Sequence, residues 1–216
     1  GSFLAAKTVK ADENIATQLQ TNYVFAASAS AKVTLDYKLT NKSATAFVES
    51  YQLKIPENGV TSLVLQQKEQ QIDKTSTLEG GFNVFELKFL NQVVGQGKSR
   101  EFSLEYSDSS LMTVRGKNIV IRLPIIGEGT TYQKYQTKVT VPTSFGEPST
   151  ILPAPTSKTN RAGQTIYTFA LAAPTEIVIK YGETQIFHFS WVKELRNHSN
   201  TTTYKQLNLP VDNEKE

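Results

Sequence analysis

Residues 32–39 read Lys-Val-Thr-Leu-Asp-Tyr-Lys-Leu and alternate strictly between polar and apolar side chains. Successive side chains of a β-strand point to opposite faces, so this stretch predicts a strand with one buried and one exposed face. The buried face would carry Val33, Leu35, Tyr37 and Leu39, and the exposed face Lys32, Thr34, Asp36 and Lys38. This pattern favours an all-β fold.

Comparable segments recur on both sides of this stretch. Residues 20–27 predict the opening strand, and the segment from Phe47 to Ile55 predicts another that ends at Pro56, because proline interrupts a strand ladder. Further strands are expected at 61–70, 82–91, 100–107, 118–123, 131–141, 164–171, 175–181, 184–194 and 202–209. Short strands separated by turn residues are typical of a β-sandwich or barrel. Residues 142–163 predict a long loop or edge segment, and residues 12–21 the one short helix.

The chain of 216 residues is long enough for two β domains of about 100 residues each. The polar run Ser107-Asp108-Ser109-Ser110 predicts a boundary between them. We therefore expect an N-terminal segment at 1–19 and two consecutive immunoglobulin-like antiparallel β-sandwiches at 20–112 and 113–216. A weak repeat agrees with two modules, since Leu-x-Asn-x-Ser-x-Thr begins at Leu39 and again at Leu195. Convergent use of the same turn residues would also explain this repeat.

The N-terminal segment bears on the compartment. Gly1-Ser2 resembles a remnant of cloning, and Val9-Lys10-Ala11 has the small residues that signal peptidase requires. Residues 3–11 therefore predict either the end of a signal peptide or an ordinary frayed terminus. The chain has no Cys, which excludes disulfides and leans towards a bacterial protein if it is exported. We expect an extracytoplasmic location, either secreted or anchored at the cell surface.

The charges limit the choice of partner. The 23 basic and 20 acidic residues give a net charge of +3 and are interspersed along the chain. Nucleic-acid binding needs clustered Lys and Arg, so no nucleic-acid partner is expected. No stretch approaches the about 18 apolar residues of a membrane helix, so no membrane segment is expected within this chain. The expected partner is an unidentified protein or carbohydrate, and the chain is expected to be monomeric.

The sequence motifs that resemble catalytic sites lack the residues or the geometry that catalysis requires. His188 and His198 are the only histidines, and no group of candidate metal ligands is evident. Ser190-Trp191-Val192-Lys193 matches S-x-x-K, but a strand would send Ser190 and Lys193 to opposite faces. Gly97-Lys98-Ser99 resembles the end of a phosphate-binding loop without its first glycine or its following helix. We therefore predict no enzyme activity, no cofactor, and no catalytic, cofactor-binding or metal-binding residue.

Two alternatives stay open. Tyr132, Tyr135 and Tyr204 would form a sugar-binding platform if they were exposed, which would suit a carbohydrate- or host-binding adhesin module. The more common role of strand tyrosines is core or cross-strand packing. A hydrolase that uses two carboxylates distant in sequence is the remoter alternative.

Short motifs carry a resemblance to a known family. Val139-Thr140-Val141-Pro142 is followed by Phe145-Gly146-Glu147-Pro148, then by Tyr181-Gly182-Glu183, and finally by Leu209-Pro210-Val211-Asp212. This series resembles the N-terminal extracytoplasmic β-sandwich region of transglutaminase-like membrane proteins of candidate-phylum bacteria. The resemblance implies a spacer or protein-interaction region that precedes a catalytic domain. That chemistry needs a Cys nucleophile, so any such activity would belong to a downstream domain.

Overall fold

The computed structural model describes residues 14–57, 59–67, 72–127 and 131–182, together with the strand backbones of 186–193 and 203–210. Strands dominate this part of the chain, which confirms the all-β prediction. The first eight strands are β1 (Ile15–Phe25), β2 (Ala31–Asn41), β3 (Ser50–Pro56), β4 (Val60–Gln67), β5 (Ile72–Glu79), β6 (Phe82–Phe89), β7 (Ser99–Asp108) and β8 (Met112–Arg115). The others are β9 (Asn118–Leu123), β10 (Tyr132–Pro142), β11 (Pro148–Leu152), β12 (Ser157–Arg161), β13 (Gln164–Leu171), β14 (Ile177–Tyr181), β15 (Ile186–Lys193) and β16 (Thr203–Pro210), and a 3-10 turn η1 covers Thr143–Phe145.

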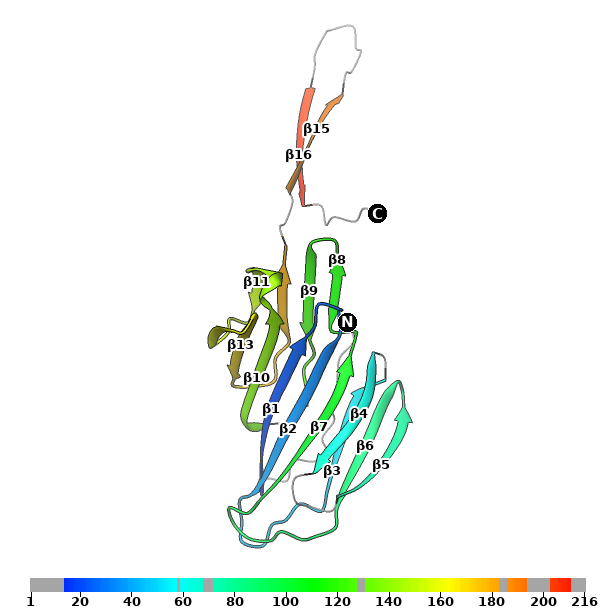
Figure 1. Ribbon diagram of the computed structural model, residues 1–216, viewed down its shortest axis with the longest axis vertical. Coiled ribbons are helices and arrows are strands. Elements are labelled where there is room, and N and C mark those ends of the chain that lie inside the picture. Colours follow the sequence, from blue (N-terminus) through cyan, green and yellow to red (C-terminus); the bar gives the residue numbers. More distant parts are fainter. Residues whose placement is uncertain are drawn as a thin grey trace. The chain divides into compact units, whose positions relative to one another are not determined.

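The chain divides into two compact units, Gly1–Tyr181 and Gly182–Glu216. The first unit is built on a seven-stranded sheet with the order β12-β13-β10-β1-β2-β7-β4 (Figure 1). Neighbouring strands in this sheet run antiparallel except at its centre, where β1 pairs with β10 in parallel. The centre of the sheet therefore joins residues that lie more than one hundred positions apart.

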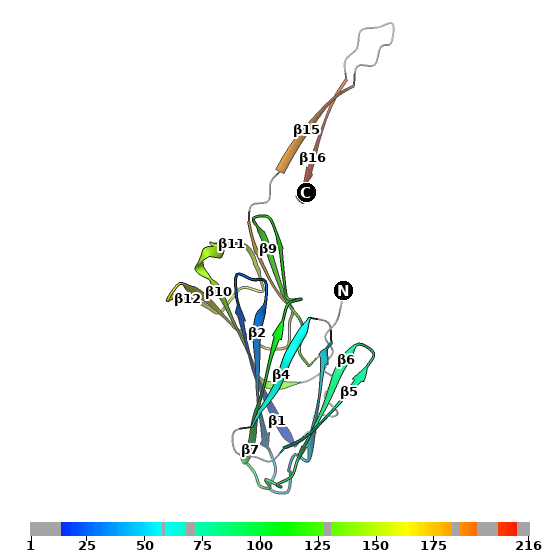
Figure 2. The ribbon, with the colours of Figure 1, turned by 45° about the vertical axis from the view of Figure 1, so that its right-hand side comes forward.

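Two smaller sheets complete the first unit. A four-stranded sheet has the order β11-β14-β9-β8, and a three-stranded sheet has the order β3-β6-β5. The three-stranded sheet lies beside the β7 and β4 side of the large sheet in both ribbon views (Figures 1 and 2). One hydrophobic cluster joins all three sheets, with Leu35 from the large sheet, Leu87 from the three-stranded sheet and Ile121 from the four-stranded sheet among its members.

The strand at the centre of the sequence prediction behaves as expected. Its four apolar side chains are at most 2% exposed, and they are Val33, Leu35, Tyr37 and Leu39. Burial of an aliphatic or aromatic side chain of this size contributes about 1.5–3 kcal/mol to folding. The other face of β2 stays partly or fully open, and it forms part of the site described below.

The expected pair of separate immunoglobulin-like sandwiches is not confirmed. β1 and β2 precede residue 112 and β10 and β13 follow it, yet all four belong to the same sheet. The proposed boundary near residue 112 falls inside the first compact unit, which continues to Tyr181. The reason is the long-range β1–β10 pairing, which no local pattern in the sequence announces.

The structure also tests the local predictions. The helix predicted at 12–21 is wrong for the described residues, because β1 starts at Ile15. Residues 142–163, predicted as a long loop or an edge segment, contain η1 and the edge strands β11 and β12, which confirms the second alternative. β5 and β8 were not expected. The possible signal remnant at residues 3–11 lies outside the described residues.

The second unit is an antiparallel pair of β15 and β16. This pairing bears on the proposed repeat, because β2 and β3 lie in different sheets whereas β15 and β16 pair with each other. β3 and β16 both end at the expected proline, Pro56 and Pro210. The two copies therefore share strand endings and differ in topology, which favours convergent turn chemistry. The second turn, at residues 195–201, lies outside the described residues.

Candidate functional site

The motifs that imitate enzyme sites lie in ordinary β structure. The S-x-x-K motif lies within β15, which confirms that this segment is a strand and not the helix that the motif requires. Gly97 has a φ of +76° and lies in a turn, where the amide of Lys98 donates to the carbonyl of Gly95 at 3.2 Å. β7 starts at Ser99, so a strand follows this turn and a phosphate-binding helix does not.

Candidate metal ligands do not converge in the described part of the chain. No group of three or more His, Asp or Glu side chains there is placed to hold a metal ion. The side chains of His188 and His198 lie outside the described residues. This finding does not bear on the carboxylate hydrolase alternative, because two carboxylates can hydrolyse a glycoside without a metal ion.

The proposed tyrosine platform is wrong for two of its three members. Tyr132 and Tyr135 are 7% and 4% exposed, and their rings pack against each other with centroids 5.4 Å apart. Both belong to β10 and are buried, although strict alternation would send residues three apart to opposite faces. The β1–β10 register shifts between Thr17 and Gln18, opposite Tyr132 and Lys134, and this bulge turns both tyrosines to the core. Burial raises the pKa of Tyr135. The side chain of Tyr204 lies outside the described residues.

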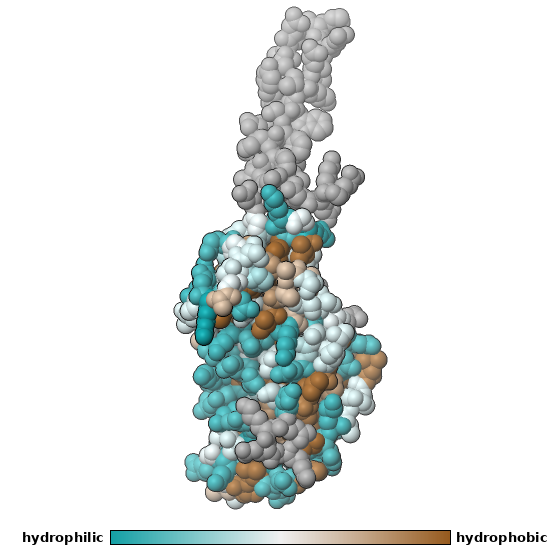
Figure 3. All heavy atoms as spheres, in the orientation of Figure 1, coloured by the Kyte–Doolittle hydropathy of each residue, from teal (hydrophilic) through white to brown (hydrophobic). Residues whose placement is uncertain are grey.

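The open surface of the large sheet is the best candidate for a binding site. We call it the polar face, and it consists of the outward side chains of β10, β1, β2 and β7. Figure 3 shows mostly hydrophilic residues over β10 and β1 in this view. These side chains are the polar half of the alternation whose apolar half builds the core.

Strand pairing arranges the polar face in rows that run across the four strands. The first row is Lys134, Gln18, Lys38 and Glu101. The second row is Gln136, Gln20, Asp36 and Ser103, and the third is Lys138, Asn22, Thr34 and Glu105. Side chains directly opposite each other on neighbouring strands lie about 4.5–5.5 Å apart at Cβ, so each row is continuous.

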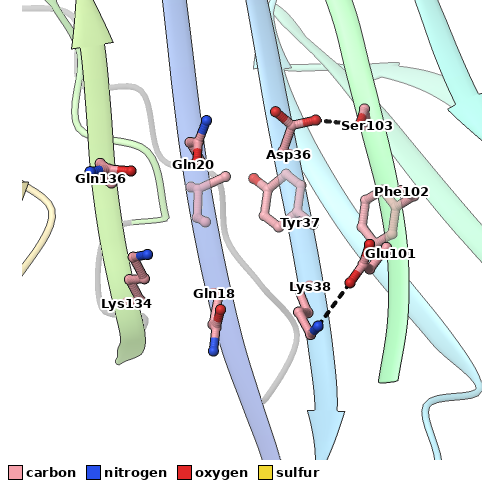
Figure 4. A pocket seen from close by; sticks show the side chains of 11 residues that line it. Gln18, Gln20, Asp36, Tyr37, Lys38, Glu101, Phe102, Ser103, Lys134 and Gln136 are labelled. Atoms are coloured by element: carbon pink, nitrogen blue, oxygen red, sulfur yellow. Dashed lines mark hydrogen bonds and ion pairs between the residues drawn. The ribbon is translucent and has the colours of Figure 1, made fainter. Parts of the chain in front are cut away.

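A hollow of about 300 Å³ lies over the first two rows. Figure 4 shows the side chains of both rows, projecting from four neighbouring strands. The lining residues are Gln18, Leu19, Gln20, Asp36, Tyr37, Lys38, Glu101, Phe102, Ser103, Lys134 and Gln136. A second hollow of about 660 Å³ lies at the β1–β2 turn, and Val24, Lys32 and Ser107 of the same outward series help to line it.

The β2 and β7 half of the polar face is neutralised internally. Lys38 pairs with Glu101 at 2.9 Å, and Lys32 pairs with Glu105 at 3.1 Å. The hydroxyl of Ser103 donates a hydrogen bond to the carboxylate of Asp36. Ion pairs as exposed as these contribute about 0–1 kcal/mol each, so they arrange the side chains more than they stabilise the fold.

The β1 and β10 half of the polar face has fewer internal ion pairs. The amide of Gln18 donates to the side-chain oxygen of Gln133 at 3.0 Å. Lys134 and Lys138 make no ion pair with any acidic residue of the described part of the chain. This half therefore presents two positive charges beside several carboxamides, a set of groups suited to reversible binding.

Sequence reasoning identified the outward residues of β2 and missed the site. Lys32, Thr34, Asp36 and Lys38 were expected on an exposed face. Their neighbours in β10 could not be expected beside them, because the parallel β1–β10 pairing has no local signal. The only available hint was the polar half of the alternation in residues 131–141.

No protein-family model matches the sequence, and no curated protein matches it. The fold resembles parts of larger solved structures. An M1 zinc metallopeptidase variant from Deinococcus radiodurans, bound to a Tyr-Ser-Ala substrate, aligns with a TM-score of 0.51 and 12% identity over 89% of this chain and 47% of its own. Yeast LTA4 hydrolase in complex with bestatin aligns with a TM-score of 0.50 and 9% identity over 88% of this chain and 31% of its own.

These similarities concern the fold alone. The chain spans about half the length of the metallopeptidase chains and about a third of the hydrolase chain. Among the described residues, no helix is long and apolar enough to cross a membrane.

Proposed function

We propose that this chain is a non-catalytic β scaffold of a larger extracytoplasmic protein, where it positions another domain or contacts a partner. The observation that carries the proposal is the single hydrophobic cluster shared by three sheets, with no group of candidate metal ligands in the described part of the chain. Such a core suits a rigid support, because close-packed interiors deform little.

The similar solved structures support a role as one part of a larger protein. In an M1 zinc metallopeptidase and in LTA4 hydrolase, the matching region is half or less of a longer chain. By analogy, this chain would accompany a catalytic part that lies elsewhere in its own protein. A transglutaminase-like catalytic domain is our proposal for that part, on the motif resemblance described above.

The size and location of the native protein test this proposal. An antibody raised against this chain should detect, in cells of the source organism, a species clearly larger than 24.0 kDa. Protease added to intact cells should degrade that species while a cytoplasmic marker survives. A native product of about the same mass as this chain, or one that is protected in intact cells, would rule out the proposed role.

A second experiment addresses catalysis. The purified chain should not hydrolyse peptide, ester or glycoside reporter substrates faster than buffer, with or without added Zn²⁺. Conversion of any of these substrates that survives repurification would favour the carboxylate hydrolase. In that case Asp36→Asn and Glu101→Gln would be the first variants to examine, because both carboxylates line the 300 Å³ hollow.

A further inference from the structure

We propose that the polar face binds a linear acidic polysaccharide of the polyuronate class, along β1 and β10. This activity goes beyond the scaffold role, and it uses residues that the shared core does not need. The proposal rests on the extent of the two hollows, on the division of charge across the face, and on the kinds of groups exposed there.

The extent of the face suits a polymer. The first hollow includes Gln18 and Lys38, and the second includes Val24 and Lys32 from the same two strands. These positions are six residues apart along each strand, which corresponds to about 20 Å at about 3.3 Å per residue. A ligand that reaches both hollows must be a chain several sugar units long.

The division of charge favours an acidic ligand. Lys38 and Lys32 already have carboxylate partners in β7. Lys134 and Lys138 face the same way four residues apart on β10 and have no acidic partner in the described part of the chain. Two unneutralised ammonium groups at this spacing, about 13 Å, would each pair with a carboxylate on an extended chain.

The exposed polar groups favour hydroxyl-rich chains. Gln20 and Asn22 of β1 lie between the lysines and β2, and Gln136 lies between the two lysines along β10. Each of these carboxamides can both donate and accept hydrogen bonds. Pairs of such bonds match the neighbouring hydroxyl groups of a sugar ring. The one exposed aromatic side chain in the described part of the chain, Phe47, precedes β3 and is not on this face.

Two other polymers fit less well. A peptide would find few apolar pockets for its side chains, because the outward positions of these rows are polar. A nucleic acid needs clustered positive charge along its phosphates, whereas the β1 and β10 half offers the two spaced lysines Lys134 and Lys138. An acidic peptide is therefore an outcome of the test below, and it is not the proposal.

Binding of polygalacturonate to the 216-residue chain tests the proposal, measured by isothermal titration calorimetry at low salt. We expect saturable binding of polygalacturonate and none of the neutral polymer pullulan. The double variant Lys134→Ala/Lys138→Ala should bind at least about tenfold more weakly, because it removes two charge-assisted contacts. Gln20→Ala should weaken binding less, since it leaves both charges in place.

A matched control separates the site from general electrostatics. Lys117→Ala/Lys180→Ala removes the same charge from exposed positions in the β8–β9 turn and in β14, and it should bind as the parent chain does. Equal weakening in both double variants would overturn the proposal, as would failure of the parent chain to bind polygalacturonate. Equally tight binding of poly-L-glutamate would also overturn it, in favour of an acidic peptide. Thermal unfolding of each variant establishes that it is folded.

Discussion

Thr21 of β1 donates a hydrogen bond of 2.8 Å from its hydroxyl to the hydroxyl of Thr137 in β10. The two residues are directly opposite in the parallel pair, and they are 0% and 1% exposed. A polar contact so deep in the core ties together two segments separated by 116 residues. The same pairing of β1 with β10 also brings together the outward side chains of the polar face.

Thr21→Val should lower the free energy of unfolding by about 1–2 kcal/mol, because it leaves the hydroxyl of Thr137 without this buried partner. The double variant Thr21→Val/Thr137→Val should cost less than the sum of the two single variants. Urea unfolding measures the free energy of unfolding of the two single variants and the double variant. Thr34→Val, on the outer face of β2, is the control and should change stability by no more than about 0.5 kcal/mol. Strict additivity of the two core changes would contradict a direct coupling.

Division of the chain at residue 112 should destroy the fold. Fragments 1–112 and 113–216 would each lose one side of the β1–β10 pair and part of the shared core. We expect neither fragment to show a cooperative thermal transition by circular dichroism. Fragment 1–182 is the control and should unfold cooperatively, because the first compact unit ends at Tyr181. Independent folding of both halves would restore the two-sandwich interpretation.

Gly127→Ala should be more destabilising than Gly116→Ala. Both glycines have positive φ, +71° and +58°, so each substitution costs about 1 kcal/mol in backbone strain. A methyl group at Gly127 would in addition overlap the hydroxyl of Tyr132, whereas the space at Gly116 is open. Overpacking of this kind costs about 1–3 kcal/mol more. Denaturant unfolding checks the difference, and adding Tyr132→Phe to Gly127→Ala should recover part of it.

Stability should fall as the pH rises above about 10. Burial raises the pKa of Tyr23, Tyr37 and Tyr51 well above the ordinary value, and neighbouring tyrosines add to the effect at all three. Above pH 10 the unfolded chain loses these protons while the folded chain keeps them. The stabilisation is therefore fully present below the unfolded pKa and is lost as the pH rises towards the folded pKa.

Each such tyrosine can contribute up to about 1.4 kcal/mol per pH unit in that range. Urea unfolding between pH 8 and 11.5 measures the slope, and Tyr37→Phe should make it shallower. Absorbance titration of the folded chain near 295 nm should show these phenols ionising only with unfolding. Reversible ionisation of all of them near pH 10 in the folded state would contradict the burial described here.

The sequence predicted strands correctly where polar and apolar residues alternate clearly. Residues 118–123 and 164–171 match β9 and β13 to the residue. β5 was missed because all but its first residue are exposed, and β12 was missed because it is exposed throughout, so neither shows a buried periodicity. Alternation reports which side of a strand is buried, and it cannot report which strand lies alongside.

The candidate site shows the same limit. The outward residues of β2 could be read from the sequence, since their apolar neighbours had to face the core. That Lys134 and Gln136 lie in the same rows follows from the β1–β10 register alone. Burial of both Tyr132 and Tyr135, three residues apart, likewise depends on the register shift between Thr17 and Gln18, which regular alternation in the sequence does not reveal.

The central position of β1 has a consequence for synthesis of the chain. β1 can pair with β2 as soon as residue 41 is available, but its other edge has no partner until residues 132–142 have been made. During that interval, one edge of a long strand offers its backbone amides and carbonyls to any other extended chain. Chaperones that cover this edge during synthesis should therefore increase the yield of folded protein, and they should leave the stability of the finished fold unchanged.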